Sequence, residues 1–278
     1  MHYELCIMNY EITEGELMNI LAIGDIVGLN GCDFLRQRLP GLKKLKGIDV
    51  VIANGENSAN GNGITPSGAE DIFASGVDVI TTGNHAFRRK EMYDYYDENE
   101  FIIRPANFPD GTTPGRGMTI IDRGRIRIAV INLMGLSFME PLDCPFKTAD
   151  RLIEKAKQEY ADIILVDFHA EATGEKRALG YYLDGRVSCF FGTHTHVQTA
   201  DEQILPNGTG YITDVGMTGP YNSVLGVKPE IIIAKLKDKL PQRFDWAEGD
   251  SKLDCVLFTV DEKTKKTTAV ERIEIKGV

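Results

Sequence analysis

The amino-acid sequence predicts one α/β domain in which two β-sheets lie between outer helices. Short apolar runs alternate with longer amphipathic segments, which is the pattern of βαβ units in a largely parallel core. The 278 residues are 42% hydrophobic and 26% charged, ordinary values for a globular protein with a full core. The sequence contains no internal repeat, low-complexity tract or linker that would divide it into separate domains.

The first half predicts three strands and two helices. Apolar runs at 20–23, 50–53 and 77–81 predict the strands, and amphipathic segments at 31–46 and 66–75 predict the helices. Thr65 and Pro66 fit the start of the second helix, since a capping hydroxyl and an early proline belong there.

The second half has the same style without repeating the sequence. Residues 118–122 and 126–131 predict paired strands, followed by a helix at 147–160. Apolar runs at 163–167, 189–192 and 211–213 predict further strands. Residues 255–260 and 269–275 predict antiparallel strands that close the chain.

Residues 1–17 have weak periodicity and precede Met18, where the first strand-like run begins. One interpretation is that residues 13–17 are a translated ribosome-binding site, so that 1–17 is a mis-started extension and 18–278 the single natural domain. The other is that Met1 is the natural start. Both stay open, and N-terminal mass spectrometry of the protein from its own cell distinguishes them.

The composition restricts the partners of this protein. With 41 acidic and 31 basic residues the formal charge is −10, so a broad basic surface for long nucleic acids is not expected. A small phosphate ester remains compatible with this negative charge, because a metal pair supplies local positive charge that the net charge of the chain does not include. The five scattered cysteines without a C-x-x-C motif indicate a reduced, cytoplasmic protein. We expect no membrane partner and no export, and a homo-oligomer stays open.

Acidic, amide and imidazole side chains follow the predicted strands at the point where each strand ends. In a parallel α/β sheet functional groups gather at the carboxyl ends of the strands, so these side chains are expected to converge. The residues are Asp25, Glu56, Asn57, Asn84, His85, His169, His194 and His196.

These residue types suit a metal centre. Carboxylate, amide oxygen and imidazole are the ligands of mixed sites for Mn, Fe or Zn. If His194-Thr195-His196 is extended, both imidazoles point to one side, because side chains alternate with period two. Two metals about 3.5–4 Å apart can then hold a bridging hydroxide and the ester oxygens for in-line displacement.

Each residue taken alone has a structural alternative. A single histidine after a strand is more often hydrogen-bonded than a ligand, Asp25 could cap a helix, and Gly83-Asn84 could be a turn. The joint pattern favours the metal centre, because four of the five histidines occupy these positions.

In this order the motifs resemble those of calcineurin-like metallophosphoesterases, D-x-H, G-D, G-N-H, H and G-H-x-H. Two departures, Val27 for the first histidine and Glu56 for the bridging aspartate, resemble the YmdB-like family of bacterial dinuclear metallophosphoesterases. Nearly the whole chain from Met18 to about Val278 is similar to that family. The matching segments are Gly24-Asp25-Ile26-Val27, Gly55-Glu56-Asn57, Gly83-Asn84-His85-Ala86, His169 and Gly192-Thr193-His194-Thr195-His196.

The resemblance implies a four-layer αββα sandwich with two divalent or trivalent metal ions, Fe or Mn above all. It also implies a hydrolase that attacks cyclic nucleotides, 2′,3′-cyclic nucleotides favoured, with a metal-bridging hydroxide. By motif, the first metal is expected at Asp25, Glu56 and His196, with Asn57 helping where Val27 cannot. Glu56 is expected to bridge to a second metal held by Asn84, His169 and His194.

His85 is expected to be catalytic rather than a ligand, protonating the leaving oxygen or stabilising its charge. Ala86 leaves it without the acidic neighbour found in many relatives, so its orienting partner is not identified from sequence. Thr218 is a weaker candidate for substrate binding in the glycine-rich segment 214–220, where a plain turn is the alternative. Asn107 and Tyr221 are further weak candidates.

Two other functions stay open. The same metal pair can cleave phosphomonoesters, which makes a broad phosphomonoesterase the alternative enzyme. The non-enzymatic alternative is a nucleotide-binding regulatory protein with little turnover.

Overall fold

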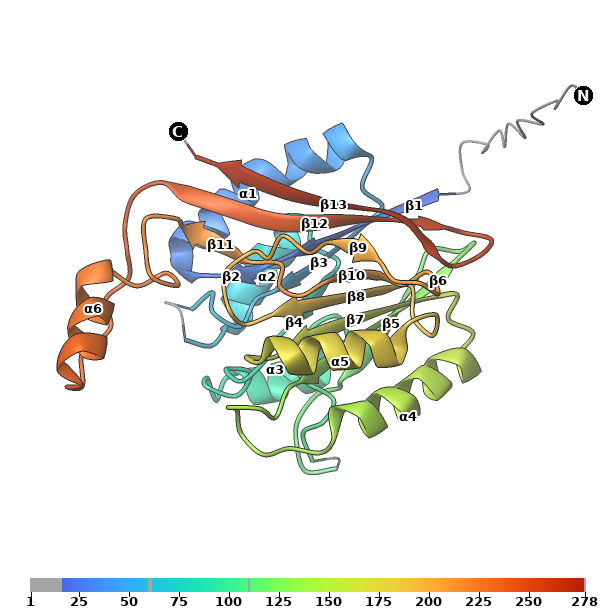
Figure 1. Cartoon of the computed structure of the whole chain (residues 1–278), viewed down its shortest axis with the longest axis horizontal. Coiled ribbons are helices and arrows are strands. Elements are labelled where there is room, and N and C mark those ends of the chain that lie inside the picture. Colours follow the sequence, from blue (N-terminus) through green and yellow to red (C-terminus); the bar gives the residue numbers. More distant parts are fainter. Residues whose placement is uncertain (1–16, 60–61, 110, 278) are drawn as a thin grey trace, which may run out of the picture.

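Two β-sheets packed face to face form the centre of the molecule, with helices on both outer surfaces (Figure 1). The structure is a computed structural model that describes residues 17–59, 62–109 and 111–277. The expected extension 1–17 lies outside these residues except for Leu17, the first residue of the first strand. The interpretation of that segment therefore stays a prediction.

The first sheet has seven strands in the order β2-β11-β12-β1-β3-β4, with β13 paired to β12. β1, β3 and β4 run parallel, whereas β12 is antiparallel to β1, β11 and β13. The strands are β1 (Leu17–Ile23), β2 (Asp25–Ile26), β3 (Val50–Asn54), β4 (Val79–Thr81), β11 (Met217–Pro220), β12 (Ser251–Asp261) and β13 (Thr267–Lys276).

The second sheet has six strands in the order β5-β6-β7-β8-β10-β9. Its central strands from β6 to β10 run parallel, and antiparallel strands close both edges. The strands are β5 (Met118–Asp122), β6 (Arg127–Met134), β7 (Ile163–His169), β8 (Cys189–Thr193), β9 (Gln203–Ile204) and β10 (Gly210–Ile212).

Side chains point alternately to the two faces of each sheet, and their apolar members form three layers. On β1, Ile20 and Ala22 face the second sheet, whereas Leu21 and Ile23 face the helices that cover the first sheet. Inner residues of both sheets fill the middle layer, and α4 and α5 cover the outer face of the second sheet. The helices are α1 (Gly28–Lys46), α2 (Pro66–Ala74), α3 (Met92–Glu98), α4 (Pro145–Gln158), α5 (Thr173–Leu183) and α6 (Pro229–Asp238).

The four-layer αββα sandwich is confirmed, and the two closing strands pair as expected. Thr65 caps α2, because its hydroxyl accepts a hydrogen bond from the Gly68 amide at 3.1 Å. The parallel character was overestimated, since β12 inserts between β1 and β11 in the opposite direction. Helix α6 projects from one end of the molecule and has no buried residue (Figure 1). No helix in the described part of the chain has the length and apolar character needed to cross a membrane.

Candidate metal centre

All eight strand-end residues meet at the carboxyl ends of the parallel strands of both sheets. Asp25 lies in β2 and His169 ends β7, while the other six follow β3, β4 and β8 in loops. Residues up to 171 positions apart therefore share one site, as the strand order requires. Asp25, Glu56 and His169 are completely buried there.

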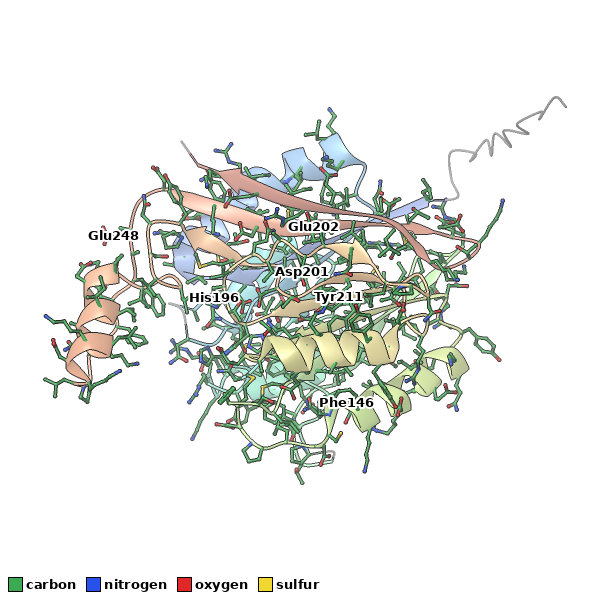
Figure 2. The ribbon with its side chains drawn as sticks, viewed as in Figure 1. Phe146, His196, Asp201, Glu202, Tyr211 and Glu248 are labelled. Atoms are coloured by element: carbon green, nitrogen blue, oxygen red, sulfur yellow. The ribbon has the colours of Figure 1, made fainter. Side chains whose placement is uncertain are left out.

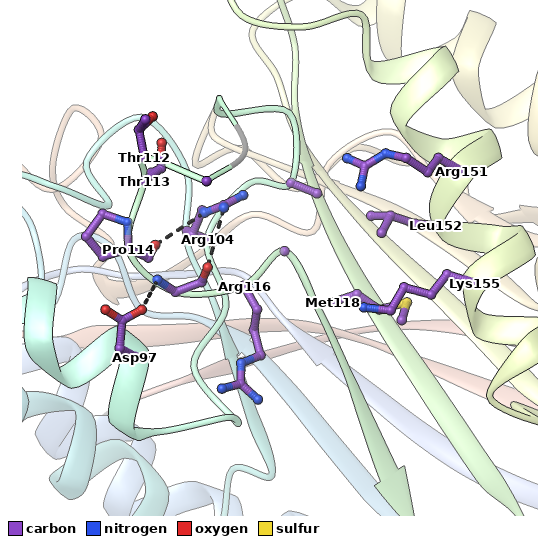
Figure 3. Close-up of a pocket in the computed structure, with 14 residues that line it drawn as sticks. Asp97, Arg104, Thr112, Thr113, Pro114, Arg116, Met118, Arg151, Leu152 and Lys155 are labelled. Atoms are coloured by element: carbon purple, nitrogen blue, oxygen red, sulfur yellow. Dashed lines mark hydrogen bonds between the residues drawn. The ribbon is translucent and has the colours of Figure 1, made fainter.

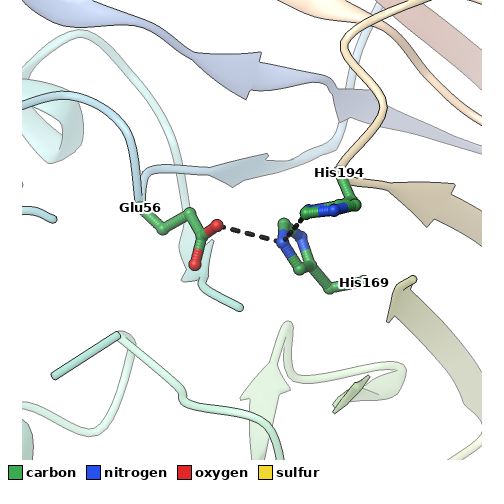
Figure 4. Close-up of side chains that lie close together, drawn as sticks. All are labelled: Glu56, His169 and His194. Carbon is green, nitrogen blue, oxygen red and sulfur yellow. Dashed lines mark hydrogen bonds and ion pairs between the residues drawn. The ribbon is translucent and has the colours of Figure 1, made fainter. Parts of the chain in front are cut away.

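Three polar atoms crowd around the Nε2 atom of His169. Glu56 Oε1 lies at 2.9 Å, Asn84 Oδ1 at 3.0 Å and His194 Nδ1 at 3.0 Å. Figure 4 shows Glu56 and His194 approaching His169 from two directions. One ring nitrogen carries at most one proton and cannot satisfy three such neighbours. Among the described residues Glu56 Oε1 completes no hydrogen bond, so a buried carboxylate oxygen is left over, as expected of a metal ligand.

A second group forms around Asp25 on the other side of the site. Asp25 Oδ1 lies 3.5 Å from His196 Nε2 and accepts a hydrogen bond from Asn57 Nδ2 at 3.3 Å. The other carboxylate oxygen of Asp25 accepts the His194 amide at 3.0 Å, which ties the two groups together. Asp25, Asn57 and His196 thus lie together, and Glu56, Asn84 and His194 lie around His169; that these residues bind metal stays a prediction.

The far ring nitrogens of His194 and His196 are held by acceptors outside the centre. His196 Nδ1 lies 3.2 Å from the Leu225 carbonyl, and His194 Nε2 lies 3.1 Å from Glu171 Oε2. Each acceptor takes the ring proton, so the lone pairs of His196 Nε2 and His194 Nδ1 face the centre. This is how histidine ligands are oriented in metal sites, by hydrogen bonds from the opposite nitrogen.

His169 is held from behind by a polar relay inside the sandwich. Its Nδ1 lies 2.9 Å from Thr193 Oγ1, and that hydroxyl donates to Asp167 Oδ1 at 2.8 Å. Asp167 also accepts the Thr81 hydroxyl at 2.5 Å. Asp167 and Glu171 stand two positions before and after His169, so one segment carries a ligand and two orienting carboxylates. Neither carboxylate was predicted as part of the site, although period-two spacing around a histidine is a signal that identifies them.

The turn that carries His194 and His196 is not extended, contrary to the geometry considered from sequence. His194 has φ 104° and His196 φ 61°, so both occupy the positive region that non-glycine residues rarely adopt. Their imidazoles consequently reach different groups of the centre. The fully buried pair Lys176–Asp214 supports this turn from below: Lys176 Nζ lies 2.6 Å from Asp214 Oδ2, which accepts the Thr195 amide at 3.1 Å.

His85 lies beside both groups and has the orienting partner that the sequence left unidentified. Its Nδ1 lies 2.8 Å from Asn57 Oδ1, and its backbone amide donates to Glu56 Oε2 at 2.8 Å. An amide oxygen only accepts, so the proton resides on Nδ1 and Nε2 is left for another partner. The side chain is 27% exposed, which leaves it accessible to a ligand.

The charged groups of the site shift one another's pKa values. Burial opposes ionisation of Asp25 and Glu56, but His196 and His169 lower the pKa of these carboxyls. Burial also opposes protonation of His169, yet Glu56 raises its pKa to about 9. Burial and the neighbouring His169 lower the pKa of His194 to about 3. Buried carboxylates facing several imidazoles are a donor set suited to divalent or trivalent cations.

Asn57 is the one expected ligand whose amide is turned the other way. Its nitrogen faces Asp25 and His196, at 3.3 Å from each, while its oxygen bonds to His85. Amide oxygen and nitrogen exchange by a flip, so direct ligation would require that flip and would release His85. In the orientation seen, Asn57 connects the centre to His85.

The weaker substrate-binding candidates are placed as follows. Thr218 is completely buried in β11, and its hydroxyl has no partner among the described residues. Asn107 is also buried, and its amide bonds both backbone groups of Met134. Tyr221 lies under the Lys276 ammonium, 5.8 Å from the ring centroid. None of these contacts points to a substrate, and the three assignments stay predictions.

A cavity of about 590 Å³ lies away from this centre. It lies between α3 and α4 and is lined by Arg104, Arg116, Arg151 and Lys155 among others (Figure 3). None of the eight strand-end residues lines it. This cavity and the cluster of strand-end side chains are therefore separate sites.

The chain is similar to known phosphodiesterases and phosphatases. The chain is 50% identical over 258 residues, 93% of its length and 97% of the other, to a 2′,3′-cyclic-nucleotide 2′-phosphodiesterase of Bacillus subtilis. The crystal structure of a novel phosphatase from Mycoplasma pneumoniae superposes with a TM-score of 0.88 at 35% identity, covering 94% of both chains.

A 5′-nucleotidase precursor from Thermus thermophilus shares the fold alone. It superposes with a TM-score of 0.55 at 12% identity, over 93% of this chain and 54% of the other. The architecture is accordingly that of the calcineurin-like metallophosphoesterases. The model of the YmdB-like protein family matches residues 21–273. With this match over most of its length, the chain belongs to the YmdB-like family.

Proposed function

We propose that this protein is a metal-dependent phosphodiesterase that hydrolyses cyclic nucleotides, with 2′,3′-cyclic nucleotides favoured. The observation that carries the proposal is the convergence of Glu56, Asn84 and His194 on His169 Nε2, each within 3.0 Å. The 50% identity to the Bacillus subtilis phosphodiesterase supports the substrate class.

Two metal ions, Fe or Mn, would be held by the two groups of donors. Asp25, Glu56 and His196 would hold one, and Glu56, Asn84, His169 and His194 would hold the other. When bound, such a pair supplies Lewis acidity toward the phosphate and activates water at neutral pH. Ligand softness does not separate Fe from Mn here, so the metal found in the cell decides between them.

His85 would act as the general acid that protonates the leaving ribose oxygen. Asn57 Oδ1 holds the ring through the Nδ1 proton, so Nε2 faces the substrate; the imidazolium formed when Nε2 takes up a second proton can give that proton to a substrate oxygen. The Glu56 carboxylate accepts the His85 backbone amide and sets the position of the ring relative to the centre. His85 would thus contact the substrate, whereas Asn57 would orient the His85 ring.

The reduced cytoplasm is the proposed location. The four described cysteines are free, and Cys189 and Cys255 are buried away from any partner thiol. A cyclic-nucleotide substrate would also be met inside the cell. Expression as a fusion to a fluorescent protein would test this, and accumulation outside the cytoplasm would contradict it.

The proposal is tested by a substrate survey of anaerobically purified protein with its metals quantified. We expect about two metal ions per chain and faster cleavage of 2′,3′-cyclic nucleotides than of 3′,5′-cyclic nucleotides or monoesters. Preference for p-nitrophenyl phosphate would instead favour a phosphomonoesterase, as the name of the Mycoplasma pneumoniae phosphatase suggests for that protein. Full metal loading without turnover would favour the regulatory alternative.

Two variants separate chemistry from metal binding. His85→Ala should retain both metals while kcat falls about 10²–10⁴-fold, the usual scale of acid–base catalysis. Glu56→Gln should lose at least one metal, because it removes the carboxylate between the two groups. Loss of metal from His85→Ala, or an unchanged kcat, would show that the roles are assigned wrongly.

A further inference from the structure

A second, smaller cavity of about 210 Å³ lies beside the Asp25 group of the candidate metal centre. It is formed by the start of α1, the end of β11 and the segment that precedes β12. Its lining includes Val27, Leu29, Pro220, Gly226, Trp246 and Glu248.

Two of the lining residues adjoin the proposed metal ligands directly. Val27 forms a β-bridge with Asn57. Gly226 follows Leu225, whose carbonyl lies 3.2 Å from His196 Nδ1. A molecule whose phosphate lies at the centre would therefore find this cavity next to it. Figure 2 shows His196 and Glu248 toward the end of the molecule where α6 projects.

The wall of the cavity is held in place by backbone contacts. Trp246 forms a bridge with Val227, and the Ala247 amide donates to the Gly226 carbonyl at 2.9 Å. Gly226 has φ +93°, and a Cβ there would lie 2.5 Å from the Val27 side chain. Close approach of the backbone thus brings the indole and Val27 to the same wall.

The chemistry of the lining suits a nucleobase. Val27, Leu29 and Trp246 offer apolar and aromatic surface, on which a base can stack. Glu248 is exposed and forms no hydrogen bond or ion pair among the described residues, whereas Asp245 is paired with Lys228. A carboxylate accepts from the exocyclic amino groups of adenine, guanine and cytosine, and it disfavours a second phosphate.

We propose that this cavity binds the base of the cyclic-nucleotide substrate, with Trp246 as the stacking surface and Glu248 as the acceptor for an exocyclic amino group. The inference rests on the proposed function and adds a base preference to it. Uracil carries no exocyclic amino group, so uridine 2′,3′-cyclic phosphate is the poorest of the four substrates.

The test compares Trp246→Ala on two diesters. Adenosine 2′,3′-cyclic phosphate has a base, and methyl riboside 2′,3′-cyclic phosphate has neither a base nor any other aromatic ring. Loss of stacking should lower kcat/KM for the nucleotide about 5- to 150-fold, corresponding to about 1–3 kcal/mol, and leave the base-free diester unchanged. Phe244→Ala is the matched control, because Phe244 is a neighbouring aromatic residue outside the cavity, packed under Lys235. It should leave both reactions unchanged.

Three further measurements keep the test independent of folding. Trp246→Phe retains an aromatic ring and should restore most of the lost kcat/KM, and Glu248→Gln should narrow the advantage of adenosine over uridine. Trp246 is the single tryptophan of the chain, so its fluorescence reports the cavity directly. Adenosine 3′-monophosphate should quench it with saturation, whereas ribose 5-phosphate should not.

The outcomes separate this inference from the function it rests on. If the unaltered protein cleaves neither diester with its metals loaded, the proposed phosphodiesterase is wrong. If it cleaves both, and Trp246→Ala slows both equally or neither, the base-binding cavity is wrong while the enzyme stands. Equal quenching by the base-free phosphate would overturn the inference as well.

Discussion

The buried pair of Lys176 and Asp214 should be a large single contribution to stability, and its removal tests how the His194 turn is held. Both side chains have 0% exposure, and Lys176 Nζ also donates to the Thr193 carbonyl at 2.8 Å. Lys176→Met keeps the apolar length of the side chain but leaves the Asp214 carboxylate buried without its cation. Breaking such a pair costs about 3–5 kcal/mol, a large part of a typical stability of about 5–15 kcal/mol.

The assay is urea unfolding of chelator-treated protein, followed by circular dichroism. Lys176→Met combined with Asp214→Asn should recover a substantial part of the loss, because the double variant no longer buries an unpaired charge. Arg36→Met is the matched control: its pair with Asp33 is 68% and 59% exposed, so its loss should cost less than about 1 kcal/mol. A Lys176→Met variant as stable as the control, or a double variant less stable than the single one, would refute the reasoning.

Three further predictions concern the centre and its surroundings. Glu171→Ala should weaken metal binding about 10- to 100-fold, because it releases the His194 ring. Glu171→Gln should bind metal with an affinity closer to that of the unaltered protein. Chelator competition measures the affinities, and equal values for Glu171→Ala and the unaltered protein would contradict this. Gly83→Ala should abolish loading of the His169 group in metal analysis, because its Cβ would lie 2.1 Å from that ring, and normal occupancy would disprove the clash. Burial raises the pKa of Asp201, but its hydrogen bonds lower that pKa by more, so the net shift is downward. The ionised form of Asp201 therefore stabilises the fold at pH values above the unfolded pKa of about 4. The melting-temperature deficit of Asp201→Asn should therefore be constant above about pH 5 and shrink as pH falls below 4, and a deficit that grows there would reverse the sign.

The fold was predictable wherever burial produced a strong pattern. The runs that became β3, β7 and β8 are mostly apolar because the sandwich buries both faces of these strands. β2, β9 and β11 have two to four residues, too few to show a period, and were missed. Helix α5 was missed because Gly180 weakens its helical pattern. The glycine is there for a tertiary reason, since a Cβ would lie 2.4 Å from the Tyr211 ring.

The residues of the site were predictable for a different reason. They are short motifs placed at strand ends, and the topology alone brings them together. Their orientation was not predictable, because the positive φ angles of His194 and His196 depend on contacts below the turn. The hydrogen bond between Asn57 and His85 likewise joins two loops that are distant in sequence, so no local sequence pattern predicts it.

The position of β12 has a consequence for synthesis of the chain. β12 is one of the last strands to leave the ribosome, yet it lies between β1 and β11, next to the turn before Asp25. The Asp254 carbonyl accepts the Gly24 amide at 3.1 Å, so the segment that leads into Asp25 is anchored by a residue made some 230 positions later. A nascent chain that stops before residue 251 lacks this anchor, so Asp25 is held in its final position only after almost all of the protein has emerged.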